Sequence, residues 1–410
     1  MTDQEIKFLL SEENNEVLDA HKEIVSIQKD KSSILRFGKD WLDSNLIGGI
    51  NNKIIFLGSR PGNGKTFHCS ETINSLLDKS LNPSPVKLLR CNLEMPTQTL
   101  LLQQICRTLE KTPREVLETP YSETERPVVT SVVNSFMDKR IKNVSKVLTG
   151  DDFRKLLINF IEPIDKEDEE LNKNSLGLLL TGDEEKDEEI IKNFKPLKTK
   201  KVCLIDHLHI YKNKEEIDTI LLICNEMKMR DKNLSFIIYF QLRRDVEDLW
   251  RETKEKKVNP KNMLPNSTFI YLTDILQQIA DIVVGMVIPQ VYDLEEYVAV
   301  YKDRHKHLED HFAEDMSDSN WVRLRGRNRI YYNFMKIRLL NSFEDPRLFC
   351  DILDAKYEET AEKIFKESKT TNTKTISLPT FENFNSTAPL PTVKPFDAFG
   401  QSFEKDTPPF

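Results

Sequence analysis

The sequence predicts an α/β protein in which helices cover both faces of a mainly parallel β-sheet. Short apolar runs, each with the length of a buried strand, alternate with segments of helical spacing along most of the chain. Strands that are apolar along their whole length are typical of parallel sheets, because helices bury both of their faces. A glycine-rich turn between the first such strand and a helical segment is the feature around which the rest of the chain is organised.

The glycine-rich turn lies in KIIFLGSRPGNGKTFH, residues 53–68. A strand that leads through such a turn into a helix N-terminus can bind a triphosphate, since backbone N–H groups and the positive end of the helix dipole converge there. We expect Lys65 to contact the β/γ oxygens and the Thr66 hydroxyl to hold Mg²⁺. The expected nucleotide-binding residues of this P-loop are Ser59, Arg60, Pro61, Gly62, Asn63, Gly64, Lys65 and Thr66. The strand and helix on either side disfavour the alternative, a glycine-rich turn with an incidental lysine.

The length of 410 residues allows one large domain or two ordinary ones. The formal net charge of −8 argues against a basic surface over the whole protein, but it is compatible with a basic channel. The six cysteines include no CxxC pair, which indicates buried, reduced thiols. No apolar run has the length of a membrane span and no secretion signal is visible, so we expect a cytoplasmic protein without a membrane partner.

An amphipathic helix is expected over residues 1–34, where apolar side chains recur at helical spacing and need a partner surface. The main domain is expected over residues 35–345. Its expected elements are strands at 54–57, 86–93, 201–206, 234–241, 282–288 and 330–340, and helices at 67–79, over most of 97–160, and at 214–231. The turn residues Asn82-Pro83-Ser84-Pro85 end the first of these helices.

Other segments are expected to depart from this alternation. Residues 162–189 hold twelve acidic residues and three lysines, which predicts a solvated insertion or a flexible excursion over about 162–195. Residues 243–268 are basic and loop-like. After the main domain we expect a helix at 346–367. Ser, Thr, Pro and Asn dominate the remaining sequence, which predicts a disordered tail at 368–410.

Polar side chains stand at the carboxyl ends of three further strands, where function gathers in a parallel sheet. They are Glu94, Asp206 and Gln241. Phosphoryl transfer to water needs a carboxylate near the metal and a group that deprotonates or orients the water. Asp206 suits the Mg²⁺ shell, and Glu94 is the candidate base because His207 rather than a second acid follows Asp206. Gln241 is expected to sense the γ-phosphate. Each residue alone could be a helix cap or a solvated side chain, but the set favours ATP hydrolysis.

Seven segments resemble, in sequence and order, the C-terminal motor domain of DnaB-type replicative helicases. They are FGKDWLDSNLIGGI, SRPGNGKT, NLEMP, CLIDHLHIY, FQLRR, QQIADIVV and RGRN, within roughly residues 35–340. The family likewise lacks the first glycine of the strict P-loop motif, where Ser59 stands here. The resemblance implies a RecA-like fold, ATP and Mg²⁺ as cofactors, and a homo-hexameric ring that acts on single-stranded DNA in replication.

The same resemblance implies roles for individual residues. Lys65 and Thr66 would bind phosphate and Mg²⁺, with Asp206 as the metal carboxylate. Glu94 would be the catalytic base and Gln241 the sensor. Two arginines, Arg325 and Arg327, have the spacing of the family's basic pair and would reach the neighbouring subunit's site, with Arg327 as the arginine finger.

Two features depart from the family. A globular N-terminal domain usually precedes the motor, whereas we expect only the helix at 1–34 here. The family's DNA-contacting loop is rich in Arg, Glu and Gly, whereas residues 269–274 read FIYLTD. Basic and aromatic residues could still bind DNA phosphates and bases, and the candidates are Arg243, Arg244, Lys256, Lys257 and Tyr271. The alternatives are a solvated charged loop and a packed tyrosine.

Two further segments have side chains that are typical of binding sites. His305, His307 and His311 lie close together, but no fourth ligand is evident, and we expect an exposed charged helix rather than a metal site. The last residues, 402–410, end in Pro-Pro-Phe after an acid and resemble the tails through which single-stranded-DNA-binding proteins recruit partners. The tail and the N-terminal helix are therefore expected contacts for replication proteins, and an inert tail is the alternative.

The sequence as a whole favours an ATP-dependent DNA helicase of the replicative DnaB class. Two alternatives use the same residues differently. One is a RecA-like ATPase of recombination, loading or packaging. The other is a non-translocating replication scaffold, which the altered DNA loop favours and the complete catalytic set disfavours.

Overall fold

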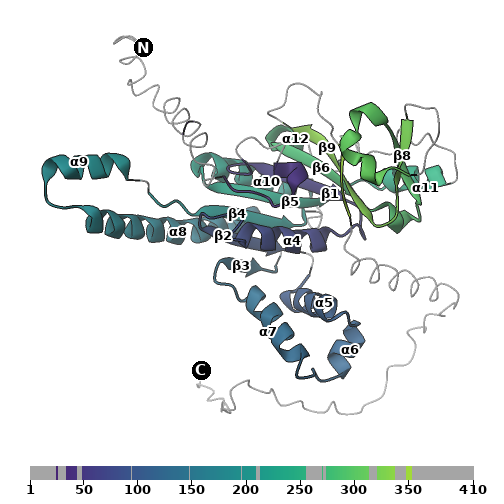
Figure 1. The fold of residues 1–410 in the computed structure, drawn as a ribbon, viewed down its shortest axis with the longest axis horizontal. Helices are drawn as coiled ribbons and strands as arrows, with labels where there is room; N and C mark the ends of the chain where they lie inside the picture. The colour runs from purple at the N-terminus through teal and green to yellow at the C-terminus, as the bar shows by residue number, and fades with distance from the viewer. Residues whose placement is uncertain are drawn as a thin grey trace, which may run out of the picture. The chain divides into compact units, whose positions relative to one another are not determined.

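The structure is a computed structural model. It describes residue 25 and residues 34–43, 49–93, 95–146, 148–194, 196–208, 213–254, 270, 274–313, 321–337 and 348–352. These residues all belong to one compact unit, in which helices pack along a sheet (Figure 1). The tail expected at 368–410 lies outside the described residues, and so does the helix expected at 1–34 apart from residues 25 and 34. No helix in the described ranges is both long enough and apolar enough to cross a bilayer.

Regular elements occupy most of the described chain. The strands are β1 (Ile54–Ser59), β2 (Val86–Asn92), β3 (Ile141–Val144), β4 (Lys200–Asp206), β5 (Leu234–Gln241), β6 (Ile282–Val287), β7 (Glu296–Tyr301), β8 (Trp321–Arg325), β9 (Arg329–Ile337) and β10 (Leu348–Ile352). The α-helices are α3 (Asp40–Asp43), α4 (Lys65–Leu77), α5 (Thr97–Leu109), α6 (Pro113–Glu118), α7 (Glu125–Phe136), α8 (Gly150–Leu179), α9 (Glu184–Asn193), α10 (Lys214–Arg230), α11 (Asp245–Lys254) and α12 (Asp274–Ile279). The 3₁₀ helices are η6 (Pro289–Tyr292), η7 (Lys302–Arg304) and η8 (Lys306–His311).

Eight of these strands form one sheet in the order β10-β9-β6-β1-β5-β4-β2-β3. The pairs from β3 to β6 are all parallel, whereas β9 runs antiparallel to β6 and β10 antiparallel to β9. The predicted α/β class with a mainly parallel sheet is therefore confirmed. Because β1 lies inside the sheet, the loop that follows it opens at the edge where the parallel strands end.

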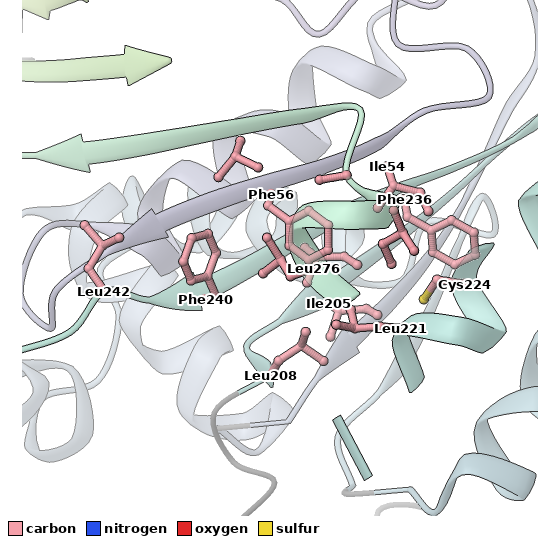
Figure 2. Packing of buried hydrophobic residues seen from close by; sticks show 14 of the residues in the cluster. Ile54, Phe56, Ile205, Leu208, Leu221, Cys224, Phe236, Phe240, Leu242 and Leu276 are labelled. Carbon is pink, nitrogen blue, oxygen red and sulfur yellow. The ribbon is translucent and has the colours of Figure 1, made fainter. Parts of the chain in front are cut away.

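The apolar character of β1 explains its central place. Ile54 and Phe56 face a cluster shared with α8, α10 and α12, part of which is drawn in Figure 2. Ile55 and Leu57 face the opposite cluster, which contains the buried face of α4. Full burial of each such side chain contributes about 1.5–3 kcal/mol, so burial on both faces anchors the strand that carries the P-loop.

The acidic segment expected to be a solvated insertion or a flexible excursion is helical. Helix α8 begins with an apolar stripe that includes Phe153 and Leu157 and is buried in the core, and it continues into the acidic residues. The returning chain is tied to α8, because Thr199 donates to Asp168 and Asn172 exchanges hydrogen bonds with Leu197. The segment is therefore helical and most of its charged side chains face solvent, while its being an insertion stays a prediction.

Two local expectations were wrong. Residues 348–352, expected in a helix, form β10, because pairing with β9 buries Leu348 in one core cluster and packs Phe349 against the other. The segment expected to be loop-like from 243 contains α11, whose Val246 and Trp250 share one buried face.

The stretch after residue 97 is mostly helical, as expected, and also includes the short strand β3, which pairs with β2 at the sheet edge.

The cysteine expectation is confirmed. All six cysteines are unpaired, five are buried and Cys350 is half-buried. Burial raises the pKa of Cys69 to about 12, so this thiol is protonated at neutral pH.

Candidate nucleotide-binding site

The P-loop joins the end of β1 to the start of α4. Gly62 and Gly64 have φ angles of 82° and 70°, in the left-handed region that favours glycine. Gly64 is the N-cap residue of α4, so the helix has no side-chain cap. The first turn of α4 contains no acidic residue. The first-turn N–H groups of α4 therefore have no acidic residue within their own turn, which suits an anion.

The two residues that begin α4 are those expected to bind phosphate and metal. Lys65 is the first helical residue and its side chain is mostly buried, while Thr66 is half-buried. Asp206, at the end of β4, is 1% exposed. The Thr66 hydroxyl and the Asp206 carboxylate are oxygen ligands of the kind that Mg²⁺ prefers.

The strand register brings the other expected residues to the same edge. Ser59 is level with Gln241, and Asn92 is level with Asp206. The Gln241 Nε2 atom lies 3.3 Å from Nε2 of His207, which is buried. The sequence alone assigned no role to His207, although its position directly after Asp206 indicated that it lies at the same edge of the sheet. Glu94 lies outside the described residues.

The side chains of two P-loop residues brace the loop against the protein. Asn63 is fully buried; its Oδ1 accepts from the backbone N–H of Ile288 at 2.7 Å, and its Nδ2 donates to the Tyr292 hydroxyl at 2.7 Å. Arg60 Nη1 donates to the Leu242 carbonyl at 2.9 Å. Any phosphate contact from these two residues would come from their backbone, because the side chains have protein partners.

The arginine pair lies on an exposed turn. Arg325 ends β8, and its Nε donates to the Phe312 carbonyl at 2.8 Å. Arg327 follows in the turn to β9, and its Nη2 lies 3.0 Å from Oε1 of Glu295, with the two side chains 72% and 78% exposed. Within the described chain, both arginines contact this outer region, and their side chains are exposed.

The DNA-binding candidates are only partly described. Arg243 and Arg244 are exposed immediately before α11, and Arg243 pairs with Asp245 at 2.7 Å. Lys256, Lys257 and Tyr271 lie outside the described residues. The histidine segment forms η7 and η8 rather than the expected single exposed helix, and His305, His307 and His311 contact Tyr301, Leu348 and Arg329 respectively.

Comparisons with known proteins give similarities at the level of structure. No protein-family model matches the sequence. No curated protein sequence matches it either. Similar solved structures include a DnaB-like replicative helicase, described with its interactions with primase, at 15% identity and a TM-score of 0.46; the match covers 79% of this chain and 62% of the helicase.

Two further solved structures are similar. One is an ATPase domain at 15% identity and a TM-score of 0.49, with 84% of this chain and 96% of that domain covered. The other is a KaiC-like protein from Pyrococcus horikoshii at 11% identity and a TM-score of 0.35, with 75% and 90% covered. The protein is an α/β chain with a strand–loop–helix arrangement from β1 to α4, and the solved structures to which it is similar include a DnaB-like replicative helicase.

Proposed function

We propose that this protein is an ATP-dependent DNA helicase of the replicative DnaB class. In this proposal the chain forms a homo-hexameric ring, hydrolyses ATP between subunits and translocates on single-stranded DNA. The supporting observation is one edge of the sheet, where the uncapped N-terminus of α4, the buried Asp206 and Gln241 come together. Parallel α/β sheets bind their ligands at this edge.

Each residue has a distinct task in the proposed reaction. Lys65 and the first-turn N–H groups of α4 bind the phosphates, and Thr66 and Asp206 hold Mg²⁺. The metal supplies positive charge that offsets the phosphate oxygens. Glu94 takes a proton from the attacking water. Gln241 and His207 form a polar pair that can respond to the γ-phosphate.

The remaining groups act outside the subunit that carries the P-loop. Arg327, with Arg325 beside it, stabilises charge at the neighbouring subunit's nucleotide, for which its exposure is suited. Arg243, Arg244, Lys256, Lys257 and Tyr271 contact single-stranded DNA. Replication proteins bind the N-terminal helix and the C-terminal tail.

ATP hydrolysis with and without single-stranded DNA tests the proposal. We expect strong stimulation by DNA and unwinding of a forked duplex. Lys65→Ala should abolish productive nucleotide binding, whereas Glu94→Gln should bind ATP normally and stop turnover, because one residue contacts phosphate and the other activates water. Hydrolysis without DNA stimulation would favour the scaffold, and stimulation without unwinding would favour recombination, loading or packaging. Near-normal turnover by Glu94→Gln would remove Glu94 as the base and make Asp206 the next candidate.

A further inference from the structure

A buried cation on β2 has no anionic partner within the described chain. Arg90 is 5% exposed and faces the same side of the sheet as Leu88, which packs in the cluster that contains the buried face of α4. No described carboxylate forms an ion pair with Arg90, and its Nε and Nη2 atoms are buried without a hydrogen-bond partner. The adjoining Cys69 thiol supplies no negative charge, because burial raises its pKa to about 12. A buried charge is costly unless an anion pairs with it.

Two other buried cations show the arrangement that Arg90 lacks. The Lys201 side chain is 2% exposed, and its Nζ pairs with Asp165 and with Asp231, the latter at 2.8 Å. The Lys228 side chain is 9% exposed, and its Nζ lies 2.6 Å from Oδ2 of Asp281. The fold therefore supplies a carboxylate to each of these two lysines, whereas the described chain supplies none to Arg90.

Arg90 lines a cavity of about 360 Å³ whose walls come from α4, β2, α5, α7 and the β3 strand with the turn before it. A volume of this size is within the range of small-molecule sites. Asn74, Gln104 and Ser131 also line the cavity, and their side chains make no hydrogen bond within the described chain. The cavity therefore combines one buried positive charge with three neutral polar groups that are available to a ligand.

The two carboxylates of the cavity wall already have partners. Arg140 donates from Nε at 3.1 Å and from Nη2 at 2.7 Å to the two oxygens of Asp138. Asp78 accepts from the Ser80 backbone N–H at 2.8 Å and from its hydroxyl at 2.7 Å. The Nε and Nη2 atoms of Arg90 form the same edge of the guanidinium that Arg140 uses. This edge matches an anion with two accessible oxygens, such as a carboxylate or a phosphate group.

We propose that this cavity binds a small oxyanion, with Arg90 supplying the charge and Asn74, Gln104 and Ser131 the neutral hydrogen bonds. The ring of Phe136, in α7, also lines the cavity, and its centroid lies 5.9 Å from Cζ of Arg90. This half-buried ring moves aside to let the anion reach the guanidinium. The bound anion then contacts β2, α4, α5 and α7 together. None of these residues belongs to the P-loop, so the site does not depend on the proposed function.

Thermal unfolding of the full chain tests the site in three buffers of equal ionic strength, containing sodium chloride, sodium acetate or sodium phosphate. Arg90→Met removes the charge and keeps most of the side-chain volume. The matched control is Arg154→Met, because Arg154 has a carboxylate partner, Glu226, and does not line the cavity. The phosphate arm is repeated with Lys65→Ala, since the P-loop is itself expected to bind phosphate. Amide hydrogen exchange in α7 reports where the anion acts.

Acetate, phosphate or both should raise the Tm of the parent and of the control by about 2 °C or more over chloride and slow exchange in α7. A response to one anion alone identifies a carboxylate or a phosphate group as the ligand chemistry. In chloride, Arg90→Met should be at least as stable as the parent, because it removes an unpaired buried charge, and neither anion should raise its Tm.

Three results would overturn the proposal. The first is a parent whose Tm and α7 exchange respond to neither anion, or respond to phosphate alone and lose that response in Lys65→Ala. The second is an Arg90→Met variant that keeps the parent's response. The third is an Arg90→Met variant that is less stable than the parent in chloride or does not fold, because Arg90 would then stabilise the protein through its contacts with Cys69 and Phe136.

Discussion

The P-loop and the arginine turn, residues 325–328, are held in opposite ways. The P-loop follows a strand buried on both faces, and Asn63 is fully enclosed with protein partners for its amide. In the arginine turn, Arg327 is exposed and forms an ion pair with the exposed Glu295. The P-loop side chains are therefore held by the protein core, whereas the Arg327 guanidinium is open to solvent and, in the proposed ring, to a neighbouring subunit. Changes to the buried packing of β1 and α4 should therefore reduce stability, whereas a change to Arg327 should reduce turnover alone.

The largest expected effect is on turnover. Arg327→Ala should fold and bind ATP but lose roughly 10³–10⁵ in hydrolysis rate, equivalent to about 4–7 kcal/mol of transition-state stabilisation. Urea unfolding and steady-state ATPase rates measure the two quantities separately. If the variant loses stability and keeps its hydrolysis rate, Arg327 stabilises the fold instead of acting in hydrolysis.

Subunit mixing sharpens this result. Arg327→Ala and Lys65→Ala should complement each other in part, because one supplies an intact P-loop and the other an intact arginine. An ATPase titration at fixed total protein, with subunit exchange confirmed separately, measures the rescue. Single-turnover hydrolysis is measured alongside, since concerted firing around a ring would mask rescue in the steady state. If subunits exchange and every mixture stays at or below the parent rates in both assays, the shared site is contradicted.

The next effect concerns the strand before the P-loop. A Cβ at Gly58 would lie 2.3 Å from the buried Phe240 ring, so Gly58→Ala should cost about 1–3 kcal/mol of unfolding free energy. Gly177→Ala is the control, because Gly177 is in α8 and a Cβ there meets nothing within 4 Å. The control should gain about 0.5–1 kcal/mol from helix propensity. Equal stabilities of the two variants would contradict the close packing of β1 on β5.

A pH effect of similar size is expected from α4. Burial, with a smaller contribution from Lys39, lowers the pKa of His68 from 6.5 to about 3. The unfolded chain therefore binds a proton below pH 6.5 that the folded chain binds only near pH 3, and stability falls as the pH falls through this window. At pH 5 the loss is about 2 kcal/mol relative to neutral pH. His68→Gln should shrink the difference in unfolding free energy between pH 7.5 and pH 5 by this amount; an unchanged difference would mean that His68 is not neutralised by burial.

The smallest effect on stability is expected at Glu295, beside the proposed arginine finger Arg327. Glu295→Gln removes the exposed partner of Arg327 and should change unfolding free energy by less than about 0.5 kcal/mol, because exposed pairs contribute little. ATP turnover should stay within about twofold. A large loss of stability in chemical denaturation would show that the arginine turn is braced like the P-loop.

The elements that could be predicted from the sequence are those whose determining residues lie close together along the chain. The β1–turn–α4 unit was predictable because its apolar run and glycines lie within sixteen residues, 53–68. Strand β10 was not predictable, since its burial depends on pairing with β9. Helix α11 was concealed by its many charged residues, among which Val246 and Trp250 are the side chains described as fully buried. The hydrogen bond from Asn63 to Tyr292 was equally unpredictable, because the two residues are 229 positions apart and no motif connects them. The catalytic and DNA-binding roles, including that of Glu94, remain predictions for the experiments above.

The central strand β1 is synthesised long before its neighbours in the sheet. Ile54 pairs with Phe236 of β5, about 180 residues later, and the partners in β6 come later still. At roughly 5–20 residues per second, a ribosome needs roughly 10–40 s to cover that distance. Throughout this interval β1 has apolar side chains on both faces and two unpaired edges, a combination that favours aggregation. The contacts among α5, α6 and α7 are local and can form at once, whereas the strand that carries the P-loop stays exposed to aggregation until β5 and β6 have been synthesised.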